Sequence, residues 1–209
     1  MRLYLVRHAQ SLRNAHIKSN NDSSLSEDGK EQARRLGIFF KKHNINYIYC
    51  SKLKRAKDTL NEILPYLSKI PVYYTKKINE HNLGIFAHNG HDDWAGYGDA
   101  VKKANIPFIE FTPEKGESLT KTFNRAKKFY QYLLKKYKDN NSNILIVGHG
   151  IFLLYLILNS MNLDILEGKY YKLSNASVSQ LDINNQGQVR NYHINDYHHL
   201  IEGALKNKK

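Results

Sequence analysis

The sequence predicts an α/β protein, a three-layer α/β/α sandwich in which a mainly parallel central sheet has helices on both faces. Short apolar segments rich in β-branched and aromatic residues alternate with segments of helical periodicity, which is typical of parallel sheets. Charged or titratable residues follow the carboxyl ends of the apolar segments. No linker, repeat or low-complexity tract divides the 209 residues, so we expect a single domain over 1–209.

The first half of the chain reads strand, helix, strand, helix, strand. Residues 2–7 (RLYLVR) are expected to form a central strand. Ser26 can cap a helix that runs to about residue 43. A second strand over 47–50 is followed by a helix that opens near residue 51, and residues 71–74 form a third short strand.

Residues 78–111 interrupt this alternation. They contain glycines, several histidines and Trp94, without a sustained hydrophobic period. We interpret the segment as a lid-like insertion over the functional edge of the sheet, helical in part over 92–104. Three of its histidines, His81, His88 and His91, fit no standard metal-ligand spacing, so no metal is predicted.

Regular order resumes after the insertion. An amphipathic helix is predicted over 118–138, a fourth strand over 143–147 and an apolar helix over 151–160. Residues 176–183 and 188–194 flank the sequence Asn-Asn-Gln-Gly, which favours a closing hairpin.

Composition narrows the class of protein. The apolar run over 151–158 is far shorter than the roughly 20 residues of a membrane span, and the amino-terminal segment reads as a strand and not as a signal peptide. Cys50 is the single cysteine, so a disulfide within the chain is excluded and a reducing cytoplasm is expected. The formal charge of +13 attracts anionic ligands such as phosphorylated metabolites.

Titratable side chains follow four of the predicted strands. Arg7 and His8 follow the first strand, Arg55 begins the helix after the second, Glu80 follows the third and His149 follows the fourth. Because the carboxyl ends of parallel strands meet at one edge of a sheet, these five groups are expected to lie close together.

Such a group of side chains suits phosphoryl transfer. A neutral imidazole is a competent nucleophile near pH 7, so His8 could accept a phosphoryl group without a metal. The guanidinium groups of Arg7 and Arg55 match phosphate oxygens, and His149 adds another donor. Glu80 would then protonate the leaving oxygen.

Several motifs also match a known family. Residues 5–11 (LVRHAQS) with Asn14, residues 25–33 (LSEDGKEQA), residues 51–59 (SKLKRAKDT), residues 79–84 (NEHNLG), residues 116–118 (GES) and residues 147–150 (VGHG) occur in the family's order. Together they resemble the histidine phosphatase superfamily, in its phosphoglycerate mutase-like branch (branch 1). The resemblance covers most of the chain.

The resemblance implies a role for each matching residue. His8 would be phosphorylated, Arg7, Arg55 and His149 would hold the phosphoryl group, and Glu80 would donate the proton. The substrate contacts are expected from Asn14, Ser11, Gln10 and the backbone at Gly150. Gln10 replaces the family's usual glutamate and Ser11 its usual threonine. No cofactor is implied.

The sequence leaves three functions open. The favoured one is a phosphatase that hydrolyses a phosphomonoester of a small anionic metabolite, with water as the final acceptor. A cofactor-dependent phosphoglycerate mutase is the main alternative, although the long insertion of such mutases is missing between Glu80 and Gly116. A non-catalytic phosphoryl-binding or nucleic-acid-binding module is the third. We expect a small phosphorylated substrate, no nucleic-acid or membrane partner, and a homodimer.

Overall fold

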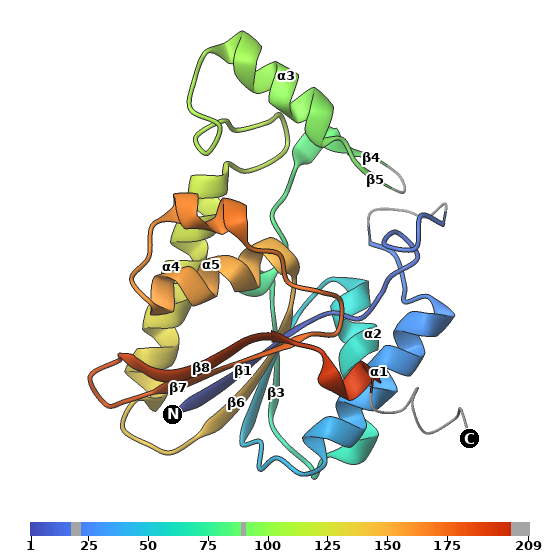
Figure 1. Cartoon of the computed structure of the whole chain (residues 1–209), viewed down its shortest axis with the longest axis vertical. Helices are drawn as coiled ribbons and strands as arrows, with labels where there is room; N and C mark the ends of the chain where they lie inside the picture. Colours follow the sequence, from blue (N-terminus) through green and yellow to red (C-terminus); the bar gives the residue numbers. More distant parts are fainter. Residues whose placement is uncertain (18–21, 89–90, 202–209) are drawn as a thin grey trace.

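The computed structural model describes residues 1–17, 22–88 and 91–201, and it has the predicted three layers (Figure 1). The central sheet has the strand order β3-β2-β6-β1-β7-β8. Four strands are parallel: β1 (Arg2–Arg7), β2 (Tyr47–Ser51), β3 (Val72–Thr75) and β6 (Asn143–Gly148). The predicted hairpin, β7 (Val178–Ile183) and β8 (Val189–Asp196), continues the sheet, with β7 antiparallel to β1 and β8 antiparallel to β7. The prediction of a mainly parallel sheet with a central first strand is confirmed.

Alternate residues of the strands bury two separate hydrophobic cores. Leu3 and Leu5 of β1 pack against the helices α4 (Leu119–Tyr137) and α5 (Gly150–Ser160). Tyr4 and Val6 point to the opposite face, which is covered by α1 (Glu27–Phe40) and α2 (Lys54–Ile63). Because both faces of β1 are buried, its sequence is a continuous apolar run rather than an alternating one.

Local signals place the ends of several helices. Ser26 and Ser118 accept hydrogen bonds from backbone N–H groups in the first turns of α1 and α4, as the capping pattern predicts. The expected start of α2 near residue 51 was early, because Ser51 still belongs to β2 and the helix begins at Lys54. The 3₁₀ helix Ile165–Tyr170 was not predicted.

The segment between β3 and α4 carries its own small hydrophobic core. It contains the two-residue strands β4 (Ala87–His88) and β5 (His91–Asp92) and the helix α3 (Trp94–Ala104), which projects from the body of the molecule (Figure 1). Leu83, Tyr97 and Val101 pack together inside it. The helix was predicted, whereas the β4–β5 hairpin was not.

The two ends of this segment lie side by side. The Ile85 N–H donates to the Glu114 carbonyl (3.0 Å), and the Glu117 N–H donates to the Asn82 carbonyl (2.9 Å). Gly84 has a φ of +55°, and a Cβ there would lie 2.0 Å from the Glu114 oxygen. Only glycine therefore allows this close approach.

Within the described residues, no helix is long and apolar enough to cross a membrane.

Candidate active site

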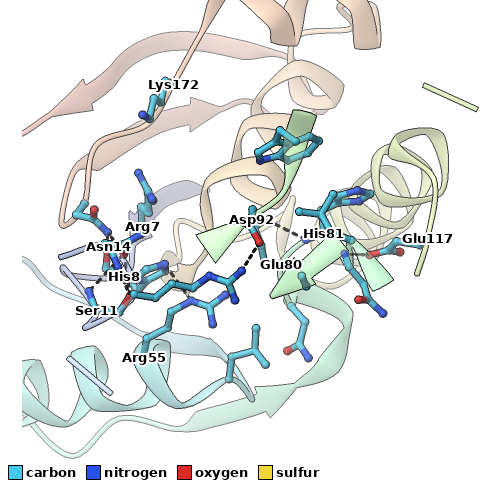
Figure 2. A pocket seen from close by; sticks show the side chains of 18 of the residues that line it. Arg7, His8, Ser11, Asn14, Arg55, Glu80, His81, Asp92, Glu117 and Lys172 are labelled. Atoms are coloured by element: carbon cyan, nitrogen blue, oxygen red, sulfur yellow. Dashed lines mark hydrogen bonds and ion pairs between the residues drawn. The ribbon is translucent and has the colours of Figure 1, made fainter. Parts of the chain in front are cut away.

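A cavity of about 920 Å³ opens at the carboxyl ends of the parallel strands (Figure 2). Most of the side chains predicted from the sequence line it: Arg7, His8, Ser11, Asn14, Arg55 and Glu80. The structure thus brings together groups that come from three separate parts of the chain.

His8 is 3 % exposed and has a defined tautomer. Its Nδ1 lies 2.8 Å from its neighbour's carbonyl, Ala9 O, and therefore carries the proton. Its Nε2 accepts a hydrogen bond from Arg55 Nε at 3.1 Å. Burial, followed by the positive charges of Arg55 and Arg7, holds the pKa of His8 well below its ordinary value. The imidazole is therefore neutral, with its Nε2 lone pair turned toward a cation.

Arg7 and Arg55 are largely buried cations at the ends of different elements. Arg7 ends β1 and donates from Nη1 to the Leu173 carbonyl, while its Nε is buried without a hydrogen-bond partner. Arg55 lies in the first turn of α2. Burial lowers the pKa of both groups, and the carboxylate of Glu80 opposes this shift. An anion between the two arginines would restore the charge interactions that burial removes.

His149 is fully buried beside His8, with ring centroids 5.1 Å apart. Its Nε2 lies 2.7 Å from Ser51 Oγ, and Ser51 Oγ donates in turn to Asn79 Oδ1 (2.8 Å). The hydroxyl proton of Ser51 is thus committed, so His149 donates from Nε2. Its Nδ1 is buried with no partner in the structure. Burial is the main cause of a His149 pKa well below the ordinary value, followed by the charge of Arg55.

The Glu80 carboxylate lies at the amino terminus of α5. It accepts hydrogen bonds from the backbone N–H groups of His81 (3.0 Å), Ile151 (3.3 Å) and Phe152 (3.2 Å). Because free N–H groups of a helix terminus favour negative charge, these contacts hold the side chain in place. Glu80 lies across the cavity from His8 in Figure 2.

Asn14 and Ser11 form one hydrogen-bonded unit. Asn14 Oδ1 accepts hydrogen bonds from Ser11 Oγ (3.0 Å) and from Asn175 Nδ2 (3.1 Å). The hydroxyl proton of Ser11 is therefore used inside the protein, while the amide N–H₂ of Asn14 is left to donate into the cavity. Asn175, which the sequence gave no reason to select, also donates to the carbonyl of His8 (3.0 Å).

Three of the predicted site residues, His149, Gln10 and Gly150, do not line the cavity. Gln10 does not line the cavity, because its Oε1 accepts a hydrogen bond from Ser26 Oγ (2.6 Å) at the start of α1. Gly150 begins α5, and a Cβ added there would lie 3.5 Å from Arg7 Nε and 3.7 Å from Glu80 Oε2. Its backbone therefore lies next to both side chains.

Sequence reasoning missed part of the cavity wall. The lining residues that the sequence gave no reason to select include Arg13, His16, Lys76, Arg125 and Lys172, whereas Asn79, Asn82 and Glu117 lie within the family motifs. Trp94 and Asp92 fall in the segment interpreted as a lid, so their region was expected to contribute. Arg125 lies within an amphipathic helix, and its spacing gave no sign that its guanidinium donates to the carbonyls of Asn79 (2.7 Å) and Glu80 (3.4 Å).

His81 is a buried titratable group at the far wall of the cavity. It is 6 % exposed, and its Nδ1 lies 2.8 Å from Thr122 Oγ1. Its ring is nearly parallel to the indole of Trp94, with 6.2 Å between centroids. Burial lowers the pKa of His81 to about 4.

The described residues contain no group of three or more His, Cys, Asp or Glu side chains placed to hold a metal ion. Metal independence stays a prediction of the sequence.

Comparison with known proteins identifies the family. A model of the histidine phosphatase superfamily (branch 1) matches residues 3–196. The chain is 28 % identical over 186 residues to a protein of Erwinia tasmaniensis named "Probable phosphoglycerate mutase GpmB", covering 87 % of this chain and 85 % of that protein. It is 31 % identical to a 2,3-bisphosphoglycerate-dependent phosphoglycerate mutase of Buchnera aphidicola, covering 84 % of this chain and 95 % of that protein.

Solved structures agree with the same fold. The alpha-ribazole phosphatase of Shigella flexneri superposes with a TM-score of 0.80 at 25 % identity, covering 94 % of this chain and 97 % of that chain. Together with the match over residues 3–196 and the arrangement of the cavity, this similarity shows that the chain belongs to branch 1 of the histidine phosphatase superfamily.

Proposed function

We propose that this protein is a phosphatase that hydrolyses a phosphomonoester of a small anionic metabolite through a phosphohistidine on His8. The observation that carries the proposal is the state of His8: a buried, neutral imidazole whose Nε2 lone pair meets the Arg55 guanidinium inside a cationic cavity. An incoming phosphoryl group would replace Arg55's hydrogen bond to Nε2 with bonds from Arg55 to its own oxygens.

In the first step, His8 Nε2 attacks phosphorus. The P–N bond forms while the P–O bond to the leaving group breaks, and Glu80 gives its proton to the leaving oxygen. Arg7, Arg55 and Asn14 donate to the phosphoryl oxygens.

In the second step, a water molecule attacks the phosphohistidine. Glu80, now ionised, accepts a proton from the water as the P–O bond forms and the P–N bond breaks. His8 Nε2 recovers its lone pair, and inorganic phosphate leaves the cavity. The hydrogen bond from Nδ1 to the Ala9 carbonyl stays in place and orients the ring throughout.

We propose that His149 becomes protonated when the substrate binds and then donates a hydrogen bond to a phosphoryl oxygen. Its Nε2 proton is held by Ser51, so a second proton must occupy Nδ1, the atom that has no partner in the structure. A bound dianion supplies the negative charge that favours this proton, and Nδ1–H can then donate to it.

Replacing the nucleophile tests the proposal. We expect His8→Ala to abolish phosphate release from aryl and alkyl phosphomonoesters while the circular dichroism spectrum stays that of the wild type. His193→Ala, an exposed residue of β8, is the matched control and should keep full activity. Undiminished turnover in His8→Ala would exclude the mechanism.

A phosphoglycerate mutase is the second candidate, because curated relatives carry that name. In that reaction the phosphoryl group passes from His8 to a substrate hydroxyl instead of water. Incubating the protein with 3-phosphoglycerate, with and without bisphosphoglycerate, separates the two. Isomerisation without release of phosphate would favour the mutase.

We further propose that residues 78–111 act as the lid of this cavity and that the enzyme works in the cytoplasm as a homodimer. Asp92 and Trp94 of that segment line the cavity, which supports the lid. The sheet ends at β8, where Tyr192 is 60 % exposed, which supports pairing between copies. Light scattering of the purified protein tests the homodimer.

A further inference from the structure

An ion pair joins the two sides of the cavity. Arg13 Nη2 donates to Asp92 Oδ1 at 2.5 Å. Arg13 belongs to the loop after β1, and Asp92 belongs to β5 in the inserted segment. Neither the family resemblance nor the mechanism above assigns a role to this pair.

Arg13 is anchored to the body of the protein. The turn that carries it is closed by hydrogen bonds from Ala15 N to the Ser11 carbonyl (3.0 Å) and from Ile17 N to the Leu12 carbonyl (2.9 Å). Its neighbour Asn14 is one of the proposed phosphoryl contacts, and the charge of Arg13 acts on Arg55 closely enough to lower its pKa. The backbone that carries Arg13 is therefore held beside the phosphoryl site.

Asp92 is the more exposed partner of the pair. Its side chain is 44 % exposed, against 13 % for Arg13. Asp92 lines the cavity, and in the view of Figure 2 it lies between the His8 side and the side of His81 and Glu117. A carboxylate from the inserted segment thus forms part of the wall of the substrate cavity. Returning it to water costs little, because it is already partly hydrated.

The charges of the cavity leave room for a second anion. Arg7, Arg13, Arg55, Lys76, Arg125 and Lys172 line it, against the carboxylates of Glu80, Asp92 and Glu117. Arg125 is paired with Glu117 at 2.7 Å. A phosphoryl dianion between Arg7 and Arg55 still leaves the lining positive, so the field favours a substrate with one more negative group.

We propose that Arg13 binds a carboxylate of the substrate. Without substrate, Asp92 occupies this position on the Arg13 guanidinium, and the substrate carboxylate displaces it. The planar guanidinium matches a carboxylate with two parallel hydrogen bonds. The substrate class is then a phosphomonoester that also carries a carboxylate. This inference rests on the proposed phosphatase function and adds Arg13 as the residue that selects the substrate.

Two closely matched phosphomonoesters test the exchange. 3-Phosphoglycerate and glycerol 3-phosphate differ only in a carboxylate against a hydroxymethyl group. We expect the wild-type enzyme to favour 3-phosphoglycerate in kcat/KM, and Arg13→Gln to lower that preference by about tenfold, the size of one charge-assisted hydrogen bond. Arg13→Lys, which keeps the charge but loses the planar fork, should recover part of the preference.

Asp92→Asn should act in the opposite direction to Arg13→Gln and strengthen binding of the carboxylated substrate. Without the competing carboxylate, KM for 3-phosphoglycerate should fall several-fold, and in the Arg13→Gln background the same change should have no effect. Arg34→Gln is the control, because it removes another arginine paired with carboxylates (Glu31 and Glu62), on α1 and away from the cavity. This variant should leave kcat/KM unchanged for both substrates.

The inference and the proposed function fail differently. Equal losses for both substrates in Arg13→Gln, or no preference for the carboxylate in the wild type, overturn the exchange while leaving the phosphatase intact. If neither ester is hydrolysed, both are measured as inhibitors of aryl phosphate hydrolysis, where the carboxylated ester should bind more tightly in an Arg13-dependent way. If the wild-type protein does not hydrolyse aryl phosphates, the proposed phosphatase function is wrong.

Discussion

Glu80 combines two tasks on one side chain, since it caps α5 and is the proposed proton donor. We expect Glu80→Gln to keep the fold, because the amide oxygen can still accept from the N–H groups of His81 and Phe152, which share one carboxylate oxygen. The value of kcat/KM, which reports the transfer of the phosphoryl group to His8, should fall by about 10² to 10⁴ on alkyl phosphates, whose leaving oxygen needs a proton, and much less on 4-nitrophenyl phosphate. Steady-state kinetics on the two substrates measures the difference. Equal losses of kcat/KM on both would contradict the role of Glu80 as proton donor.

His81 makes stability depend on pH. Its pKa is about 4 in the folded protein and near its ordinary 6.5 when unfolded, so the unfolded chain binds more protons between these values. The contribution of neutral His81 is fully present above pH 6.5 and is lost as the pH falls toward 4. It is on the order of 3 kcal/mol. Urea unfolding at pH 7.5 and 4.5 should show a smaller loss of stability on acidification for His81→Gln than for the wild type, and parallel losses would contradict the assignment.

At the residue scale, the sequence predicted the groups that follow strand ends. Arg7, His8 and Arg55 are fixed in place by a strand end or a first helical turn, so their neighbourhood can be inferred from local pattern. Arg13 and Arg125 meet the cavity through contacts between segments distant in sequence. No local period encodes such contacts, which is why both were missed.

At the element scale, the first turn of α1 touches the backbone of the loop after His8. A Cβ on Gly29 would lie 1.9 Å from the Gln10 carbonyl oxygen, and that oxygen also accepts from the Ser26 N–H (3.0 Å). We expect Gly29→Ala to destabilise the fold by roughly 2 kcal/mol, because a backbone atom cannot move aside as a flexible side chain does. It should also lower kcat, since Gln10 lies two residues from the nucleophile. Chemical unfolding and phosphatase assays measure both effects.

Gly98 provides the matched control. It lies within α3, where an added Cβ meets no atom within 4 Å. Gly98→Ala should stabilise the protein by up to about 1 kcal/mol, because alanine loses less backbone entropy in a helix. If both alanines proved equally tolerated, the close approach at Gly29 would have no energetic weight.

The predictability of the elements follows their length. Helices α1 and α4 bury one face over several turns, so their period is visible in the sequence. The strands β4 and β5 contain two residues each, too few for any alternation to register. Their pairing, which carries Asp92 to the cavity, follows from the tertiary arrangement of the inserted segment.

At the scale of the whole molecule, the charge of +13 should act on substrate binding. A positive field raises the local concentration of an anionic substrate, and salt screens it over about 10 Å at 0.1 M. We therefore expect KM for a phosphomonoester to rise several-fold between about 20 mM and about 300 mM NaCl, with kcat nearly constant. Initial rates at matched pH give both constants. A KM independent of salt would mean that only the buried arginines, which solvent ions do not reach, govern binding.

The strand order has a consequence for synthesis on the ribosome. Strand β1 leaves the exit tunnel long before its partners, because it pairs only with β6 and β7, and β6 also separates it from β2. Translation at about 5–20 residues per second therefore leaves an apolar strand without partners for several seconds, which makes the nascent chain a client for chaperones that shield such segments. Prematurely terminated products that end before β6 would contain the nucleophile but could not build the pocket around it.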